Sequence, residues 1–345
     1  MPRERGYIGI HTEEWRQIMK AVVIVQRAGQ ERPTLEYQTV EDPVPQASEL
    51  LVSVRAAGIN RIDLHRSTAH GGPAAGKPLI AGLEMSGDVI AIGAGVTDFK
   101  IGDKVMGMTT GAYAELATID HRVALRVPPE FSYDQATAVA TVYPTAHNAL
   151  VTNGQFSRGK TVLIQAVSSA VGIAALQIAK AMGAKCVIGT GRPNANADRL
   201  AEIGLDRFLI GGQDDIPAEV LKVTDGRGVD VVVDMVGGPA ISDNLECVTL
   251  AGRIVSVGWV GGTKGEIDLD TLARKRISLV GVSFRTRTLE QKTALFAEFT
   301  RDVSPFFVSG ALVPVIAASY PLSEALAAQD AMAEDKHFGK ILLHP

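Results

Sequence analysis

Short apolar runs separated by turn residues fill the chain from Lys20 to about Pro128. They include ELLVSVRAAGI, GDVIAIGAGV, IGDKVMGM and RVALRVPP. Runs this short, with turns this frequent, are typical of antiparallel strands in a barrel-like β domain. The pattern predicts that this domain begins at Met19, after an N-terminal extension, residues 1–18, that has no apolar signal segment.

From Lys160 onward, strand and helix patterns alternate. Six apolar strand patterns (TVLIQA, KCVIGT, RFLIG, VDVVVDMV, GRIVSVG and ISLVGVSF) are separated mainly by helical patterns such as VGIAALQIAKAMG and AISDNLECVTL. This alternation predicts a parallel, doubly wound six-stranded sheet. Gly183 and Gly204 follow two of the helical patterns, where a left-handed residue is favoured. After Phe284 come two more helical patterns, the strand VPVIAASY and the strand HFGKILL, so we expect the chain to return to the first domain.

Composition narrows the class of protein. The 345 residues suffice for two domains, and a net charge of -4 gives no electrostatic reason to bind nucleic acid or an anionic membrane. No apolar run reaches the roughly 18 residues that a membrane span needs. Cys186 and Cys247 are too few for a disulfide framework or a cysteine-rich zinc site, and we expect both thiols to be buried. These features predict a cytoplasmic protein.

The segment QAVSSAVG, residues 165–172, lies between the first strand and the first helix of the predicted sheet. A loop there points backbone N–H groups and the positive end of the helix dipole at an anion. Small residues stand where glycines would permit close approach, and serine hydroxyls can donate to phosphate oxygens. The alternative is an ordinary strand-to-helix turn. The predicted phosphate contacts are Ser168, Ser169, Ala170, Val171 and Gly172.

The second strand bears on the choice of cofactor. A fold that binds NAD carries an acidic residue about 20 residues past the loop, which accepts hydrogen bonds from the ribose. The stretch CVIGTGRPN has no carboxylate; Gly191 leaves room there, and Arg192 brings a permanent cation suited to phosphate. This favours NADPH over NADH, unless Arg192 is simply a solvated loop residue.

Eight segments in order carry a family resemblance: AAGINRIDL, AGLEMSGDVIAIGAGV, GDKVMG, GAYAELA, QAVSSAVGIAALQIAKAMGA, GVDVVVDMVGG, GRIVSVG and HFGKILL. From about Met19 to Leu343 the chain resembles the medium-chain dehydrogenase/reductase superfamily, in particular its zinc-free quinone oxidoreductase branch. The resemblance implies a GroES-like β-barrel catalytic domain, 19–143 with 286–345, and a Rossmann dinucleotide-binding domain, 144–285.

The resemblance also bears on zinc. In zinc alcohol dehydrogenases of this superfamily, the catalytic ligands correspond by register to Asn60 in GINRID, Leu83 in GLE and about Thr141 in TVYPTA. An amide, an isobutyl group and a hydroxyl are not the thiolate, imidazole or carboxylate that Zn²⁺ prefers. MGMTTGAYAEL has no cysteine for a structural zinc either. We therefore expect no bound metal.

Candidate roles near the nicotinamide follow from the same resemblance. It implies that the Asn60 amide bonds an oxygen of the cofactor or substrate, and that Asp63, in the N-x-x-D pattern, has a structural or a catalytic role. Thr145 matches a family threonine near the nicotinamide ribose. Relatives often carry tyrosine where this chain has His65, so the acid stays open among His65, Tyr143 and solvent.

By family register, Gly258 and Phe284 follow the fifth and sixth strands of the sheet, at the edge where such sheets bind ligands. The apolar last strand, ISLVGVSF, is an exposed edge that invites pairing with a second copy, so we expect a homodimer.

Without a Lewis acid, the feasible reaction is hydride transfer from NADPH to a quinone or an α,β-unsaturated carbonyl. Two alternatives remain at this point. One is an enoyl-thioester reductase of the same superfamily, which usually has a tyrosine that NRIDLHRSTAHGG lacks. The other is a non-catalytic binding or structural relative.

Overall fold

The computed structural model describes residues 18–27, 33–65 and 78–345, and its contacts divide the chain into two compact units. Unit 1 comprises Met1–Thr141 and Ile316–Pro345, and unit 2 comprises Val142–Val315. Residues 286–315, which the resemblance assigns to the catalytic domain, group with the parallel sheet by contacts. The division into folding domains stays a prediction.

Unit 1 is built mainly on antiparallel strands, and only β14 and β15 pair parallel among the described strands of this unit. β1 pairs with β2, and a seven-stranded sheet has the order β14-β15-β3-β4-β5-β7, with β6 also paired to β3. The strands are β1 (Ile18–Val25), β2 (Thr34–Glu41), β3 (Glu49–Gly58), β4 (Glu84–Ile92), β5 (Lys104–Met108), β6 (Leu116–Asp120), β7 (Ala124–Arg126), β14 (Ile316–Pro321) and β15 (Lys340–His344). Its helices are η1 (Arg61–His65), η3 (His121–Val123), α1 (Tyr133–Ala140), η6 (Leu322–Glu324) and α9 (Ala325–Ala333).

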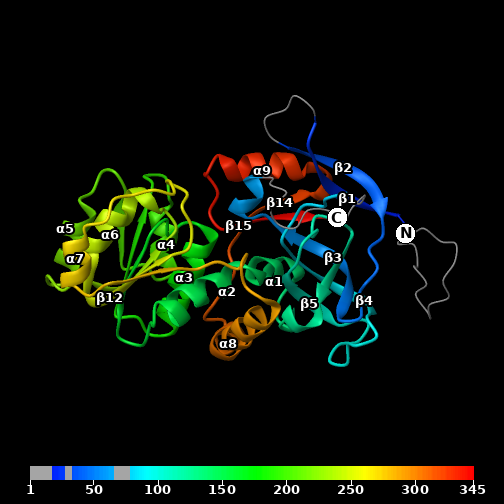
Figure 1. Cartoon of the computed structure of the whole chain (residues 1–345), viewed down its shortest axis with the longest axis horizontal. Helices are drawn as coiled ribbons and strands as arrows, with labels where there is room; N and C mark the ends of the chain where they lie inside the picture. Colours follow the sequence, from blue (N-terminus) through cyan, green and yellow to red (C-terminus); the bar gives the residue numbers. More distant parts are fainter. Residues whose placement is uncertain (1–17, 28–32, 66–77) are drawn as a thin grey trace. The chain divides into compact units, whose positions relative to one another are not determined.

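The chain returns to unit 1 at its C-terminus, as predicted. β15 pairs antiparallel with β3, with Leu342 opposite Gly58, while α1 packs on β3 and β4 (Figure 1). This pairing brings Lys340, near the end of the chain, beside residues that follow β3. A position 280 residues along the sequence from Asn60 thereby becomes its neighbour.

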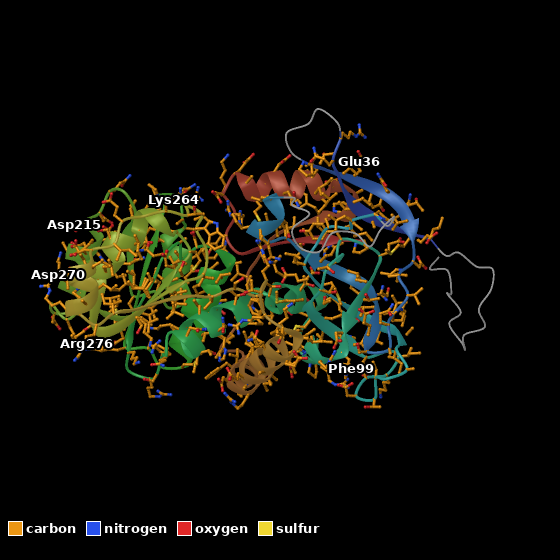
Figure 2. All side chains as sticks on the ribbon, viewed as in Figure 1. Glu36, Phe99, Asp215, Lys264, Asp270 and Arg276 are labelled. Carbon is orange, nitrogen blue, oxygen red and sulfur yellow. The ribbon has the colours of Figure 1, made fainter. Side chains whose placement is uncertain are left out.

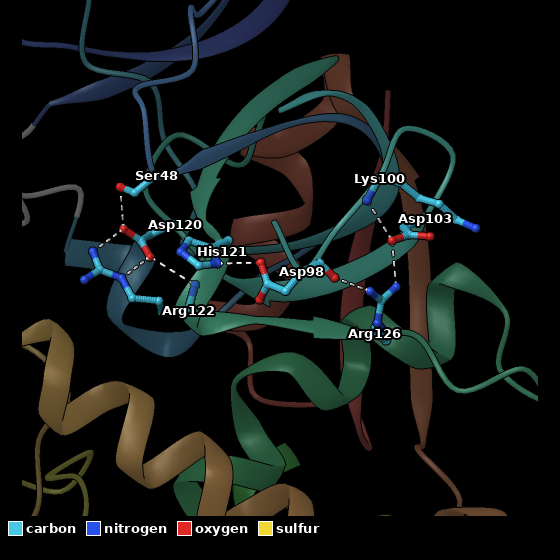
Figure 3. A network of polar contacts seen from close by, with 8 residues as sticks. All are labelled: Ser48, Asp98, Lys100, Asp103, Asp120, His121, Arg122 and Arg126. Carbon is cyan, nitrogen blue, oxygen red and sulfur yellow. Dashed lines mark hydrogen bonds and ion pairs between the residues drawn. The ribbon is translucent and has the colours of Figure 1, made fainter. Parts of the chain in front are cut away.

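Loops of unit 1 are joined by a network of charged side chains (Figure 3). Asp120, the N-cap of η3, accepts hydrogen bonds from the guanidinium of Arg122 at 2.7 and 2.8 Å and from Ser48 at 2.9 Å. The bonds from Arg122 hold the pKa of Asp120 at about 2. His121 is hydrogen-bonded to Asp98 at 2.7 Å.

Unit 2 is a parallel six-stranded sheet with the order β10-β9-β8-β11-β12-β13, which confirms the predicted doubly wound fold class. Its strands are β8 (Thr161–Ile164), β9 (Cys186–Gly191), β10 (Arg207–Ile210), β11 (Val229–Asp234), β12 (Val248–Ser256) and β13 (Ser278–Gly281). Its helices are α2 (Val142–His147), the π-helix η4 (Asn148–Asn153), α3 (Ala170–Ala181), α4 (Ala197–Glu202), α5 (Ile216–Val223), η5 (Gly238–Ala240), α6 (Ile241–Cys247), α7 (Leu269–Arg274) and α8 (Leu289–Val308).

Helices cover the central strands, so β8 is buried along its whole length. On one face, residues of α5, α6 and α7 join an apolar cluster with Leu163, Val232 and Ile254 of the sheet. Polar side chains such as Asp215, Asp270 and Arg276 lie on the outside of this unit (Figure 2). The strand order reverses between β8 and β11, and parallel sheets of this kind usually bind ligands at the carboxyl ends of the strands beside such a reversal.

Several local predictions can be compared with the structure. Gly183 and Gly204 have φ of +85° and +102°, as expected after helices. The segment VTL, expected at the end of a helix, instead begins β12, because Val248 pairs with Val229 of the neighbouring strand.

Cys247 is buried, and burial raises its pKa to about 12, whereas Cys186 is only partly buried. No helix among the described residues has the length and apolarity to cross a membrane.

Candidate active site

The predicted phosphate loop begins α3. Ser169 is the N-cap, and its Oγ accepts a hydrogen bond from the N–H of Gly172 at 3.1 Å. A Cβ at Gly172 would lie 2.6 Å from the carbonyl oxygens of Ala166 and Val167, so only glycine permits this approach of helix to loop. Ala166 turns the chain in the left-handed region, with φ of +52°. The loop is therefore tight because of its small residues.

This loop has the chemistry that a phosphate requires. The first turn of α3 contains no acidic residue. Ala170 and Val171 contribute N–H groups that the helix itself does not use, and the partly exposed Ser168 adds a hydroxyl. The cap occupies the Ser169 oxygen as an acceptor but leaves its proton for donation. These residues fit the phosphates of a dinucleotide.

The end of β9 lies beside this loop. A Cβ at Gly191 would come 2.9 Å from the ring of Phe208 and 3.0 Å from Ala195, so the strand end has no room for a larger side chain. The next residue, Arg192, is exposed, and no residue of β9 carries a carboxylate. The charge of Arg192 and the absence of a carboxylate fit a phosphorylated ribose.

A buried polar network that the sequence patterns did not reveal holds β8, β9 and α6 together. Thr190 donates to Gln165 Oε1, and Gln165 Nε2 donates to Asn244 Oδ1 at 2.7 Å. The N–H of Val167 donates to the carbonyl of Thr190 at 2.9 Å. The sequence carried a sign of this network in the polar residues Gln165, in QAVSS, and Thr190, in VIGT, which lie beside apolar strand residues. The network fixes the phosphate loop relative to the end of β9.

Two further predicted residues lie at carboxyl ends of strands in unit 2. The N–H of Gly258 donates to the carbonyl of Asp234, at the end of β11, at 3.3 Å. Phe284 follows β13; its partly buried ring lies 6.2 Å from that of Phe296, centroid to centroid. The sheet thus brings them to the same edge as the phosphate loop.

Tyr143 and Thr145 lie on α2. Thr145 is partly exposed, whereas Tyr143 is 2% exposed. The hydroxyl of Tyr143 donates to Gln177 at 2.9 Å, and its ring contacts that of Phe307 edge to face at 5.2 Å. Burial also raises the pKa of Tyr143 well above its ordinary value. This environment is that of a core tyrosine whose proton is already shared.

Asn60 lies in unit 1, directly after β3, in a network with two buried charges. Its Nδ2 donates to Glu84 Oε1 at 2.8 Å, and its Oδ1 accepts from Lys340 Nζ at 2.8 Å. Lys340 and Glu84 also form an ion pair, and their side chains are 2% and 0% exposed. Neither Glu84 nor Lys340 was predicted from the sequence to be part of the site. The sequence did carry a sign of these two residues, because each is a charge among apolar neighbours: Glu84 lies within LEM, and Lys340 begins KILL.

Asp63 extends this network through its contacts with the backbone of Asn60 and with Tyr113. Its Oδ2 accepts from the N–H of Asn60 and from the hydroxyl of the buried Tyr113, each at 2.8 Å. Burial raises the pKa of Asp63 to about 6, although these two bonds and Lys340 act in the opposite direction. Asp63 thereby fixes the backbone of Asn60. The side chain of His65 lies outside the described residues.

The positions that correspond to zinc ligands do not fit the metal. Asn60 Oδ1 already contacts the ammonium of Lys340, which would repel a dication at that oxygen. Leu83 has no donor atom, and Thr141 offers only a hydroxyl. Among the residues that the structure describes, no group of three His, Cys, Asp or Glu side chains is placed to hold a metal ion.

Comparison with known proteins agrees with both units. Residues 46–129 match the alcohol dehydrogenase GroES-like domain, and residues 170–298 match the zinc-binding dehydrogenase family. The chain is 30% identical over 337 residues to the quinone oxidoreductase of Sus scrofa, across 95% of this chain and 98% of that protein. For the quinone oxidoreductase of Rattus norvegicus the identity is 28%, across 95% and 98%.

Solved structures agree as well. A quinone oxidoreductase from Pseudomonas syringae has a TM-score of 0.82 at 29% identity, across 95% of this chain and 100% of that one. A mycobacterial structure complexed with NADPH has a TM-score of 0.82 at 28% identity, with the same coverage. The chain therefore belongs to the quinone oxidoreductase family of oxidoreductases, within the medium-chain dehydrogenase/reductase superfamily.

Proposed function

We propose that this oxidoreductase uses NADPH to reduce a quinone or an α,β-unsaturated carbonyl without zinc. The observation that carries the proposal is the end of β9, where Gly191 and Arg192 stand in place of a carboxylate beside a tight, small-residue loop. The mycobacterial structural relative complexed with NADPH and the relatives named quinone oxidoreductase support it.

In this proposal the residues of unit 2 bind the cofactor. N–H groups of Ala170 and Val171 and the hydroxyls of Ser168 and Ser169 bind the diphosphate, and Gly172, whose N–H is engaged by the cap, lets it approach the backbone closely. Contacts nearer the nicotinamide are assigned to Thr145, Gly258 and Phe284. Arg192 pairs with the ribose phosphate, which NADH lacks.

We assign the hydrogen bond to the acceptor, and the supply of its proton, to residues of unit 1 or to solvent. When bound, NADPH supplies the hydride. Asn60 donates an N–H to the acceptor's carbonyl oxygen and stabilises the negative charge that develops there. The product still needs a proton. Because the Tyr143 hydroxyl is buried and bonded to Gln177, we assign that proton to His65 or solvent.

We further propose a homodimer formed along β13. This strand ends the sheet order of unit 2, so one side of its backbone has no partner strand within the unit. Leu279 is 40% exposed on this edge. A second copy that pairs there would cover it. Light scattering at micromolar concentration tests the proposal, and a strict monomer would contradict it.

The reaction is tested by following NADPH oxidation with a panel of quinones, small enones and a crotonyl thioester. We expect turnover with quinones or enones, a lower rate with NADH, and no loss of rate after dialysis against a metal chelator. No turnover with any acceptor, together with no thermal shift on addition of NADPH, would favour a non-catalytic relative. Turnover confined to the thioester would favour an enoyl-thioester reductase.

A further inference from the structure

The side-chain amide of Asn60 is held from both ends by groups of opposite charge. Lys340 Nζ can only donate and Glu84, when ionised, can only accept. Lys340 bonds the amide oxygen and Glu84 bonds the amide nitrogen, each at 2.8 Å. An amide turned by 180° would face donor with donor and acceptor with acceptor, so these two charges determine which way the Asn60 amide points.

The surroundings are built to keep these charges in place. A Cβ at Gly58 would lie 2.3 Å from Glu84 Oε1 and 2.8 Å from Lys340 Cε, so the glycine at the end of β3 makes room for both. The pair is buried, and the second oxygen of Glu84, Oε2, has no hydrogen-bond partner among the described residues. Such a buried pair is a weak source of stability, because desolvation offsets its attraction. Its arrangement around one amide points instead to a role in the reaction.

Two bonds leave part of the Asn60 amide unused. The bond to Glu84 uses one of the two N–H donors of the amide, and the bond from Lys340 uses one of the two lone pairs of its oxygen. No described residue bonds the remaining N–H or the remaining lone pair. Asn60 is itself only partly buried. One N–H with a fixed direction is therefore available to a ligand.

We propose that Glu84 and Lys340 are positioning residues that hold the Asn60 amide so that its second N–H meets the carbonyl oxygen of the acceptor. This inference rests on the proposed function, in which Asn60 is that donor. It adds the two residues that orient the donor before any acceptor binds. A preorganised donor needs no reorientation as charge develops on the oxygen.

The first test is the double variant E84Q/K340M, which removes both charges of the pair together, so that neither is left buried without the other. The glutamine side chain introduced on β4 can accept from or donate to the amide, so either orientation of Asn60 now finds a partner. We expect kcat with an enone to fall by about 10-fold to 100-fold. KM for NADPH should stay unchanged, because its proposed contacts lie in unit 2. Wild-type kcat in this variant would overturn the inference.

A second variant, N60D/E84Q, keeps both partners of residue 60 and removes the donor. A carboxylate at residue 60 accepts from Lys340 and from the amide of the introduced glutamine, and the net charge of the group stays the same. We expect kcat to fall by about 100-fold, as when one oxyanion donor is removed. The matched control is Ser86→Ala, also on β4, which removes buried hydrogen bonds to Thr137 and Tyr133 without touching Asn60. Its kcat should equal that of wild type.

A spectroscopic measurement tests the orientation without turnover. The chain has six asparagines, so ¹⁵N-asparagine labelling gives few side-chain signals, and the loss of one in N60D/E84Q assigns residue 60. We expect one slowly exchanging proton on the Asn60 amide of wild type and fast exchange of both in E84Q/K340M. Unchanged exchange in that variant would overturn the inference even in an enzyme that turns over. Absence of turnover in wild type with the expected exchange pattern would instead refute the proposed function alone.

Discussion

Replacing Asp63 by asparagine should change how the stability of this protein depends on pH. The carboxylate sits in η1, and burial raises its pKa from the ordinary value of 3.8 to about 6. Its Oδ2 accepts hydrogen bonds from the N–H of Asn60 and the hydroxyl of Tyr113. An asparagine oxygen can accept the same two bonds, so the substitution removes the ionisable group with little change in packing.

The sign and size follow from the two pKa values. Between pH 3.8 and about 6, the folded protein keeps the proton on Asp63 while the unfolded chain loses it. The folded state then binds more protons, so its free energy of unfolding falls as the pH rises. At about 1.36 kcal/mol for each pH unit, this interval amounts to about 3 kcal/mol. That contribution is fully present below pH 3.8 and is lost above about pH 6.

Urea denaturation followed by circular dichroism, at steps from about pH 3.5 to pH 7, measures this difference. The free energy of unfolding of wild type minus that of Asp63→Asn should fall by about 3 kcal/mol across the range. Asp270→Asn is the control, because that side chain is 82% exposed on α7. Parallel curves for wild type and Asp63→Asn would refute the assignment of a desolvated carboxyl at this position.

Three further predictions concern other parts of the molecule. Arg192→Ser should lower the ratio of kcat/KM for NADPH to that for NADH by about 10-fold to 100-fold, because one charge-assisted contact to phosphate is lost; an unchanged ratio would contradict the assigned role. Gly172→Ala should lower the Tm and weaken NADPH binding in a fluorescence titration, since its Cβ would lie 2.6 Å from two carbonyl oxygens; the idea fails if both values match wild type. Asp120→Asn should destabilise the protein at neutral pH by roughly 1 to 2 kcal/mol, after allowing for the exposure of Arg122. Because the pKa of Asp120 is lowered to about 2, this loss should vanish as the pH falls from 4 toward 2; a Tm difference that persists there would argue against the ion pair.

Much of the fold follows from local patterns. Alternating strands and helices after Lys160 predicted all six parallel strands, because each strand is a short apolar run between helical patterns, and a central strand such as β8, buried on both faces, is apolar throughout. Gly183 and Gly204 were recognised as helix ends because a left-handed residue there favours glycine. The sequence did not predict that β12 begins at Val248, because pairing with β11 outweighs the helical pattern of AISDNLECVTL at its last three residues.

The candidate site likewise has one part that the sequence predicted and one part that it did not. The phosphate loop is local, so its small residues, its serines and the following helix were readable from consecutive positions. The partners of Asn60 were not, because Glu84 and Lys340 are 24 and 280 residues away from it. Their charges stood out in apolar runs, but nothing in the sequence indicated that they face each other.

The amino-acid sequence by itself determined the strand and helix pattern, the small-residue turn before α3 and the absence of a carboxylate at the end of β9, since each depends on neighbouring residues. Only the tertiary structure decided what surrounds Asn60 and Tyr143. Antiparallel pairing of β15 with β3 brings a lysine from near the C-terminus to the Asn60 amide, and packing against Gln177 engages the tyrosine hydroxyl in the core. Contacts of this kind depend on the register of distant segments, which hydrophobic periodicity does not encode.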